Sequence, residues 1–323
     1  MDIEDALICA WRVAGPQSEA IAVETLTDQL PEGPLWIHLN RDAPGLNQWL
    51  KDIAGIPPHT VAAMLQEDTR PRCEILPQGV MLNLRGINFN EGASPEDMLS
   101  LRVWSSPTLL ITLRKRPLNT IQTIRDHLQA GNGPHSLGHL IVQLVAGLTD
   151  RVARRAEELG DELDELEDQV MSGRRGPLDS ISQLRASVVR LRRFLAPQAV
   201  ALGQLLEAES ESLTEADRAF LRNAIDSTQR VIEELDALRE RASILRDDIS
   251  NELSAQMGRN MYAFTLLAGI FLPLGFITGL LGVNVAGIPG AQTSDAFWIL
   301  CGILACLLTL EVWLLRRLNM WRA

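Results

Sequence analysis

The chain has 323 residues, of which 46% are hydrophobic and 22% charged, and its formal net charge is −11 at pH 7. This acidity argues against nucleic acid as a partner, because binding phosphates needs a basic surface that releases counterions. Four scattered cysteines without zinc-ribbon spacing favour reduced, cytosolic thiols, and the acidic N-terminal segment 1–5 lacks the apolar core of a signal peptide.

Residues 1–145 alternate short apolar runs with turn residues, which predicts a cytoplasmic α/β domain. The runs of four to eight residues bounded by Gly, Pro, Asn or Asp are expected to be strands, and the segments with helical spacing are expected to lie between them. The expected strands are 6–13, 35–39, 79–84, 99–104 and 108–113, and the expected helices are 45–53, 59–67 and 118–129.

From residue 136 the pattern becomes helical, and residues 146–260 are expected to form a helical stalk region. A first helix over 136–170 ends at a Gly- and Pro-containing turn, and a return helix over 178–206 contains Pro197 as a kink or break. Thr214 opens a third helix with a capping box, and its apolar phase continues to Gly282. Such a helix is roughly 100 Å long and needs partner helices to cover its apolar stripe.

Two apolar spans follow at the C-terminal end, because no charged residue occurs between Arg259 and Asp295. We expect a first transmembrane helix over 261–283, an outer loop over 284–295, a second transmembrane helix over 296–316 and a cytoplasmic tail over 317–323. Arginines flank both spans on one side and the loop has none, so the positive-inside rule puts both termini in the cytoplasm. The expected location is the inner membrane.

Two spans cannot enclose a pore, so transport by this chain would require a symmetric oligomer. Asn284 follows Gly282 and Val283 where the first span leaves the membrane. Repeated around an axis, its amide carbonyls could form a ring that holds a hydrated divalent cation. The alternative is that these three residues only cap the helix and turn the chain.

The sequence resembles the CorA-type metal ion transporters, which carry a Gly-x-Asn signature at the outer end of their first span. The valine of Gly282-Val283-Asn284 and the following Gly287-Ile288-Pro289-Gly290 are more similar to the ZntB-like zinc-transport branch. Three cytoplasmic motifs are similar to the same branch, namely Glu67–Glu74, Asn83–Asn88 and Pro95–Arg102. The resemblance implies a homopentamer with a funnel-shaped cytoplasmic domain, whose first spans line the pore and whose second spans face lipid.

The resemblance implies that Asn284 forms the outer selectivity ring, shaped by Gly282 and Val283. Helical spacing back from this ring predicts the pore-facing side chains or, alternatively, side chains that pack on neighbouring helices. These are Gly275, Leu272, Ala268, Thr265 and Met261. Leu272 and Met261 could form apolar constrictions that gate by dewetting.

Other acidic and histidine residues have a weaker claim to function. The segment 157–168 holds eight acids in twelve residues, which predicts a solvated helix face or, alternatively, a regulatory cation site at Glu157, Glu158, Asp161, Glu162, Asp164 and Glu165. Glu311 lies in the second span, where an ion pair or snorkelling competes with a role in proton coupling. His135 and His139 have zinc-like spacing but no third ligand nearby.

The sequence therefore predicts an inner-membrane transporter of divalent cations with no cofactor, and nothing in it indicates an enzyme. The resemblance favours zinc uptake linked to protons. A magnesium, cobalt or nickel channel of the same fold is the first alternative, and a membrane-anchored sensor or scaffold is the second. The expected partners are the metal ion, membrane lipid and further copies of the same chain.

Overall fold

The computed structural model describes residues 3–67, 70–172, 178–208, 213–282 and 294–317. The chain divides into two compact units, Met1–Arg246 and Asp247–Ala323. The long helix α6 (Glu215–Leu281) contributes residues to both units.

The first unit contains a seven-stranded sheet with the order β2-β1-β3-β7-β6-β5-β4. Strands β3 and β7 are parallel, and all other neighbours are antiparallel. All five strands predicted from the sequence are present, and β2 and β4 are additional. The bounds are β1 (Leu7–Arg12), β2 (Glu19–Ala20), β3 (Leu35–Asn40), β4 (Arg72–Leu76), β5 (Gly79–Gly86), β6 (Leu99–Ser105) and β7 (Leu109–Arg114).

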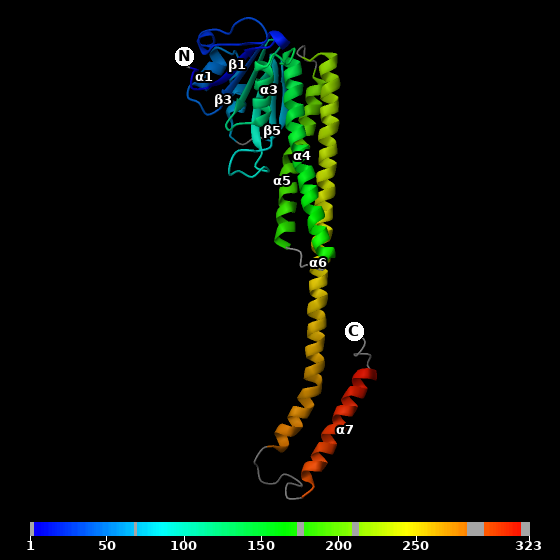
Figure 1. Cartoon of the computed structure of the whole chain (residues 1–323). Coiled ribbons are helices and arrows are strands. Elements are labelled where there is room, and N and C mark those ends of the chain that lie inside the picture. Colours follow the sequence, from blue (N-terminus) through cyan, green and yellow to red (C-terminus); the bar gives the residue numbers. More distant parts are fainter. Residues whose placement is uncertain (1–2, 68–69, 173–177, 209–212, 283–293, 318–323) are drawn as a thin grey trace. The chain divides into compact units, whose positions relative to one another are not determined.

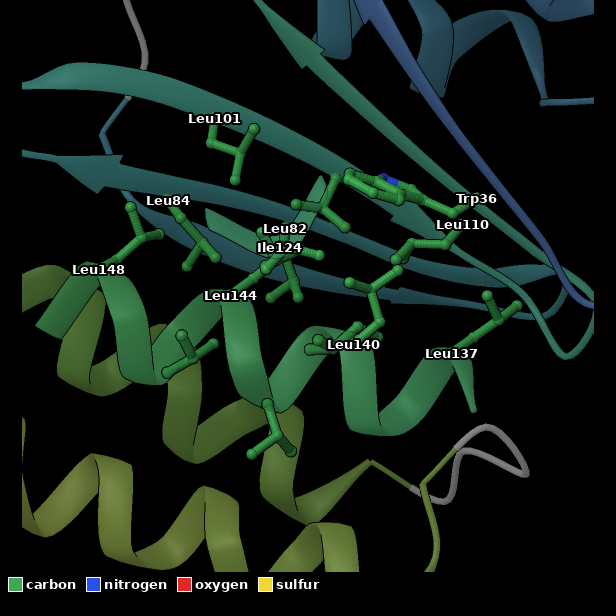
Figure 2. Packing of buried hydrophobic residues seen from close by; sticks show 14 of the residues in the cluster. Trp36, Leu82, Leu84, Leu101, Leu110, Ile124, Leu137, Leu140, Leu144 and Leu148 are labelled. Carbon is green, nitrogen blue, oxygen red and sulfur yellow. The ribbon is translucent and has the colours of Figure 1, made fainter. Parts of the chain in front are cut away.

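Each face of the sheet is covered by its own helices, because successive strand residues point to opposite faces. Helices α1 (Leu46–Asp52) and α2 (Pro58–Leu65) pack with Ile37 and Ile111 on one face. Helices α3 (Asn119–Gln129) and α4 (Leu137–Met171) pack on the other face. Figure 2 shows this second core, in which Leu140, Leu144 and Leu148 of α4 lie against Trp36, Leu82, Leu84 and Leu110 of the sheet. Two short 3-10 turns, η1 (Gly15–Gln17) and η2 (Val23–Leu26), complete the domain.

Helix α4 continues into a bundle with α5 (Leu178–Glu207) and the first part of α6 (Figure 1). The predicted starts of α4 and α6 are confirmed. Ser136 accepts a hydrogen bond from the His139 amide, and Thr214 Oγ1 accepts one from the Asp217 amide at 3.2 Å. Buried contacts and ion pairs join the three helices, for example Thr149 to Thr228 at 3.1 Å. Pro197 lies inside α5, so the predicted break is absent and the helix passes through it.

The second unit contains the end of α6 and helix α7 (Ala296–Arg317). Both helices are long and apolar enough to cross a membrane, as predicted. In each of them, the half-buried residues follow one stripe at steps of three or four, which we call the covered stripe, and the exposed residues lie on the other sides. The stripe of α6 is Tyr262, Leu266, Ile270, Pro273, Leu274 and Ile277, and that of α7 includes Ala296, Leu300, Leu304, Leu307, Glu311 and Leu315.

Candidate functional site

The apolar part of α6 stays helical even though it contains a proline. Pro273 has no N–H, so the carbonyl of Gly269 cannot receive the usual intrahelical hydrogen bond. Two threonines bond back to their own helix: Thr265 Oγ1 donates to the Met261 carbonyl at 2.8 Å, and Thr278 Oγ1 donates to the Leu274 carbonyl at 3.0 Å. These bonds satisfy the hydroxyl protons within the helix, as membrane segments require.

The five residues predicted to face a pore all lie on the uncovered side of α6. Met261 is 69% exposed and Leu272 is 73% exposed, and Thr265, Ala268 and Gly275 are also exposed. At about 100° per residue, these five form one stripe on the face opposite the half-buried residues of the same helix. The uncovered stripe is therefore the surface that a single chain leaves for water, lipid or other copies of the chain.

This uncovered stripe combines one hydroxyl with small and apolar side chains. Thr265 Oγ1 uses its proton within the helix, so its lone pairs remain available to accept a hydrogen bond from a water. Gly275 is open, since a Cβ built there would meet no atom within 4 Å. Side chains of this kind offer no set of charged ligands that would strip a cation of its water.

The predicted outer ring falls largely outside the described residues. Gly282 closes α6, and its amide donates to the Thr278 carbonyl at 2.9 Å. Val283 and Asn284 lie outside the described part of the chain, as does the outer loop up to residue 293. The ring at Asn284 therefore stays a prediction.

Glu311 lies on the covered stripe of α7, a position that the sequence did not reveal. Its Oε2 atom is buried without a hydrogen-bond partner, and it forms no ion pair among the residues that the structure describes. Tyr262, on the covered stripe of α6, also has a buried hydroxyl without a partner there. Unpartnered polar atoms between two apolar helices are costly and are by default functional. The position of Glu311 could have been found from helical spacing. Steps of three or four residues place Glu311 on the same face of the second span as Leu304 and Leu307.

The six acids proposed as a regulatory cation site do not converge within one chain. Glu158 and Glu162 both accept from Arg155, at 3.1 and 2.9 Å, and Asp164 accepts from Arg241 at 2.6 Å. Glu157, Asp161 and Glu165 are exposed. In the described ranges, no three His, Cys, Asp or Glu side chains are grouped as a metal site. The arrangement favours the interpretation as a solvated, ion-paired helix face.

The ion pair of Arg241 joins α6 to α4 beside this acidic face. Its guanidinium also donates to Glu167 at 2.7 Å, and the hydrogen bonds to Glu167 and Asp164 raise the pKa of Arg241 above its ordinary value. His135 and His139 stack with ring centroids 5.5 Å apart. They belong to no group of three metal ligands in the described segments.

Comparisons with known proteins agree with these features. The family model for CorA-like Mg2+ transporter proteins matches residues 31–317. The divalent cation transporter CmaX of Pseudomonas aeruginosa is 38% identical over 295 residues, which cover 90% of this chain and 89% of CmaX. The zinc transport protein ZntB of Yersinia pseudotuberculosis is 34% identical over 318 residues, which cover 98% of this chain and 96% of ZntB. The solved structure of full-length CmaX superposes with a TM-score of 0.85 and covers 98% of both chains at 35% identity.

Proposed function

The chain belongs to the family of CorA-like Mg2+ transporter proteins, and on this premise we propose that it carries divalent cations, zinc above all, across the inner membrane. Similarity to zinc transport proteins over 98% of the chain supports zinc as the cargo. The structural observation that carries the proposal is the uncovered stripe of α6. This helix has 67 residues and contributes to both the first and the second unit.

A pore requires several copies of the chain. Two spans cannot surround a water-filled path, and the stripe of Met261, Thr265, Ala268, Leu272 and Gly275 has no cover from α7. Copies of α6 arranged around an axis would bury this stripe against a shared channel, with α7 between α6 and the lipid. We propose the homopentamer that the resemblance implies.

The assignment of segments follows from this arrangement. Residues 1–145 form the cytoplasmic α/β domain, 146–260 the helical stalk, 261–283 and 296–316 the two spans, and 284–295 the outer loop. Both termini are cytoplasmic, because arginines flank the spans on that side only. Asn284 then lies at the outer mouth, where its amide carbonyls would hold a hydrated cation.

The energetics allow uptake without ATP. Two positive charges that cross an inside-negative membrane gain about 4.6 kcal/mol per 100 mV. A proton gradient would add to this, and Glu311 is the only acid in the second span that could respond to it.

The proposal is tested by flux into proteoliposomes that contain the purified chain. Zinc, magnesium, nickel and cobalt are compared, with and without an imposed pH gradient and membrane potential. We expect zinc to enter fastest, and Asn284→Ala to reduce zinc entry and relax the preference for zinc. Unchanged zinc flux and selectivity in Asn284→Ala would refute the ring.

The same experiment separates the alternatives. The family model's description favours magnesium as a second candidate cargo. Faster entry of magnesium than of zinc would support that channel. A chain that passes none of the four ions would support a membrane-anchored sensor or scaffold.

A further inference from the structure

Three neighbouring strands bring polar side chains together on the face of the sheet that α3 covers. Cys9 of β1 is the register partner of His38 on β3, and His38 is the register partner of Thr112 on β7. Directly opposed residues of paired strands have Cβ atoms roughly 5 Å apart. Arg114 lies two residues beyond Thr112 and therefore points to the same face, where its register partner Leu101 belongs to the core beneath α3.

A second arginine joins this cluster from α3. Arg125 directly follows Ile124, whose side chain packs between α3 and the sheet (Figure 2), and Arg125 itself is half-buried. The positive charge of Arg125 acts on the pKa values of Cys9, His38 and Arg114. Because the interaction between charges weakens with distance, the guanidinium of Arg125 lies near all three groups.

Three nitrogen atoms of this cluster are buried and have no hydrogen-bond partner among the described residues. They are Nε of Arg114, Nε of Arg125 and Nε2 of His38. Nδ1 of His38 lies 2.8 Å from Thr112 Oγ1, which accepts from Trp36 Nε1. The single hydroxyl proton of Thr112 finds its acceptor in this Nδ1, so we assign the imidazole proton to Nε2. All three nitrogen atoms are therefore donors, and the cluster lacks an acceptor.

The two arginines have no carboxylate that balances their charge in the described part of the chain. Neither of them forms an ion pair there, and Asp126, beside Arg125, is exposed and accepts from Gln122 at 2.7 Å. Burial and the charge of Arg125 lower the pKa of Arg114, and the opposing influence comes from Cys9. Burial raises the pKa of the Cys9 thiol to about 11, so this thiol is neutral at pH 7. The cluster therefore carries one uncompensated positive charge from each arginine.

This combination of donors and charge selects the kind of ligand. A metal ion does not suit the cluster, although cysteine and histidine are metal ligands, because both guanidinium groups would repel it. One water molecule has two lone pairs, so it cannot accept from all three donors, and it balances no charge. An oxyanion has several acceptor oxygens, and two of them match the fork of a guanidinium group. In Arg125, Nη1 donates to Gln122 at 3.4 Å, which leaves Nε and Nη2 for such a fork.

From this geometry we propose that Arg114 and Arg125 bind a small oxyanion with two negative charges, such as hydrogen phosphate or sulfate, between α3 and the sheet. Two charges match the two guanidinium groups, and Nε2 of His38 supplies a neutral donor at the buried end of the cluster. Both arginines are half-buried, so the anion can enter from solvent. The site belongs to the first unit and uses no residue of the apolar helices.

The test uses the full-length chain in detergent and in buffer stripped of divalent cations, with sodium sulfate as the probe. Isothermal titration calorimetry should show saturable binding of one sulfate per chain, competition by orthophosphate, and much weaker binding of chloride. Arg114→Gln and Arg125→Gln should each weaken sulfate binding by about tenfold, because each removes a charge-assisted fork. Arg125→Lys keeps the charge but not the planar fork and should also weaken binding.

Matched controls remove a cation elsewhere in the first unit. Lys51→Gln on α1, which covers the opposite face of the sheet, and Arg222→Gln on α6 should bind sulfate like the wild type. Sulfate should also raise the melting temperature of the wild type and of both controls, but not that of the Arg114 and Arg125 variants.

The proposal is overturned if the wild type shows no saturable sulfate binding, if chloride binds as tightly as sulfate, or if Arg125→Gln binds sulfate like the wild type. Equal losses in the two controls would also overturn it. Because no transported metal is present, the outcome is independent of the proposed transport function.

Discussion

Acid should destabilise the α/β domain through one buried histidine. His38 on β3 is fully buried, and its Nδ1 lies 2.8 Å from Thr112 Oγ1, which also accepts from Trp36 Nε1 at 2.9 Å. Its Nε2 has no hydrogen-bond partner among the described atoms. Burial, reinforced by the nearby positive charge of Arg114, lowers the pKa of His38 from 6.5 to about 3. The folded protein therefore holds this imidazole neutral.

The sign and size of the effect follow from linkage. The pKa of His38 is lower in the folded than in the unfolded state, so the unfolded chain binds a proton first as pH falls. Its contribution is fully present above pH 6.5 and is lost progressively towards pH 3. At about 1.36 kcal/mol per unit, pH 5 should cost about 2 kcal/mol of the free energy of unfolding. This is a large part of the roughly 5–15 kcal/mol that typical domains have.

Urea titrations of the full-length chain at several pH values, followed by tryptophan fluorescence, measure this loss. His38→Asn keeps a group that can hydrogen-bond to Thr112 but does not titrate, so stability should fall about 2 kcal/mol less between pH 7 and pH 5 than in the wild type. His127→Asn, on the exposed face of α3, is the matched control and should behave like the wild type. If His38→Asn and the wild type lost equal stability, the reasoning would be refuted.

Three further predictions concern the spans and the ion pair that joins α4 to the loop between β5 and β6. Gly275→Leu should block zinc flux in proteoliposomes, whereas Gly302→Leu in the second span should not. The two glycines are matched, because a Cβ built at either of them meets no atom within 4 Å. Equal zinc fluxes in the two variants would contradict the assignment of Gly275 to the pore face. Glu96→Ala should lower the free energy of unfolding by about 2 kcal/mol in urea titrations, because a 3%-exposed residue loses its 3.0 Å ion pair with Arg155; unchanged stability would show that this pair contributes nothing. Glu311→Gln should abolish the dependence of zinc flux on an imposed pH gradient, and a retained dependence would assign Glu311 a packing role.

The sequence predicts an element well where its hydrophobic periodicity extends over many residues. It predicts poorly the strands that form because a neighbouring strand pairs with them. Helix α6 was predicted almost to its ends, because its apolar phase persists from the capping box at Thr214 to Gly282. Strand β2 has only two residues, and β4 reads Arg-Cys-Glu-Ile-Leu with partly exposed side chains. Neither strand carries a local hydrophobic signal, and both exist because a neighbouring strand pairs with them.

The ion pairs of Asp42 with Arg41 and Lys115 could not be predicted, because they depend on strand order. Arg41 and Lys115 are distant in sequence and meet only because β3 and β7 are parallel neighbours. One sequence gives the ends of strands but not which strands are adjacent. The acidic run on α4 illustrates the reverse case. Its local charge density is plain in the sequence, yet Arg155 and Arg241 pair with four of its acids.

To find which side of α6 faces a pore, the exposure of its different sides must be compared. The sequence alone does not supply this comparison. Counting back from Asn284 gives a stripe, but an apolar helix shows no contrast between a pore, a partner helix and lipid. The stripe of Tyr262, Leu266 and Ile270 provides that contrast, because it is less exposed than the other sides of α6. A helix that packs on its own partner along one side has only the remaining sides for a channel and for other copies. The proposed lining lies within that remainder, and a shift by one residue towards the C-terminus, which turns the face by about 100°, would place it on the half-buried residues Tyr262, Leu266 and Pro273.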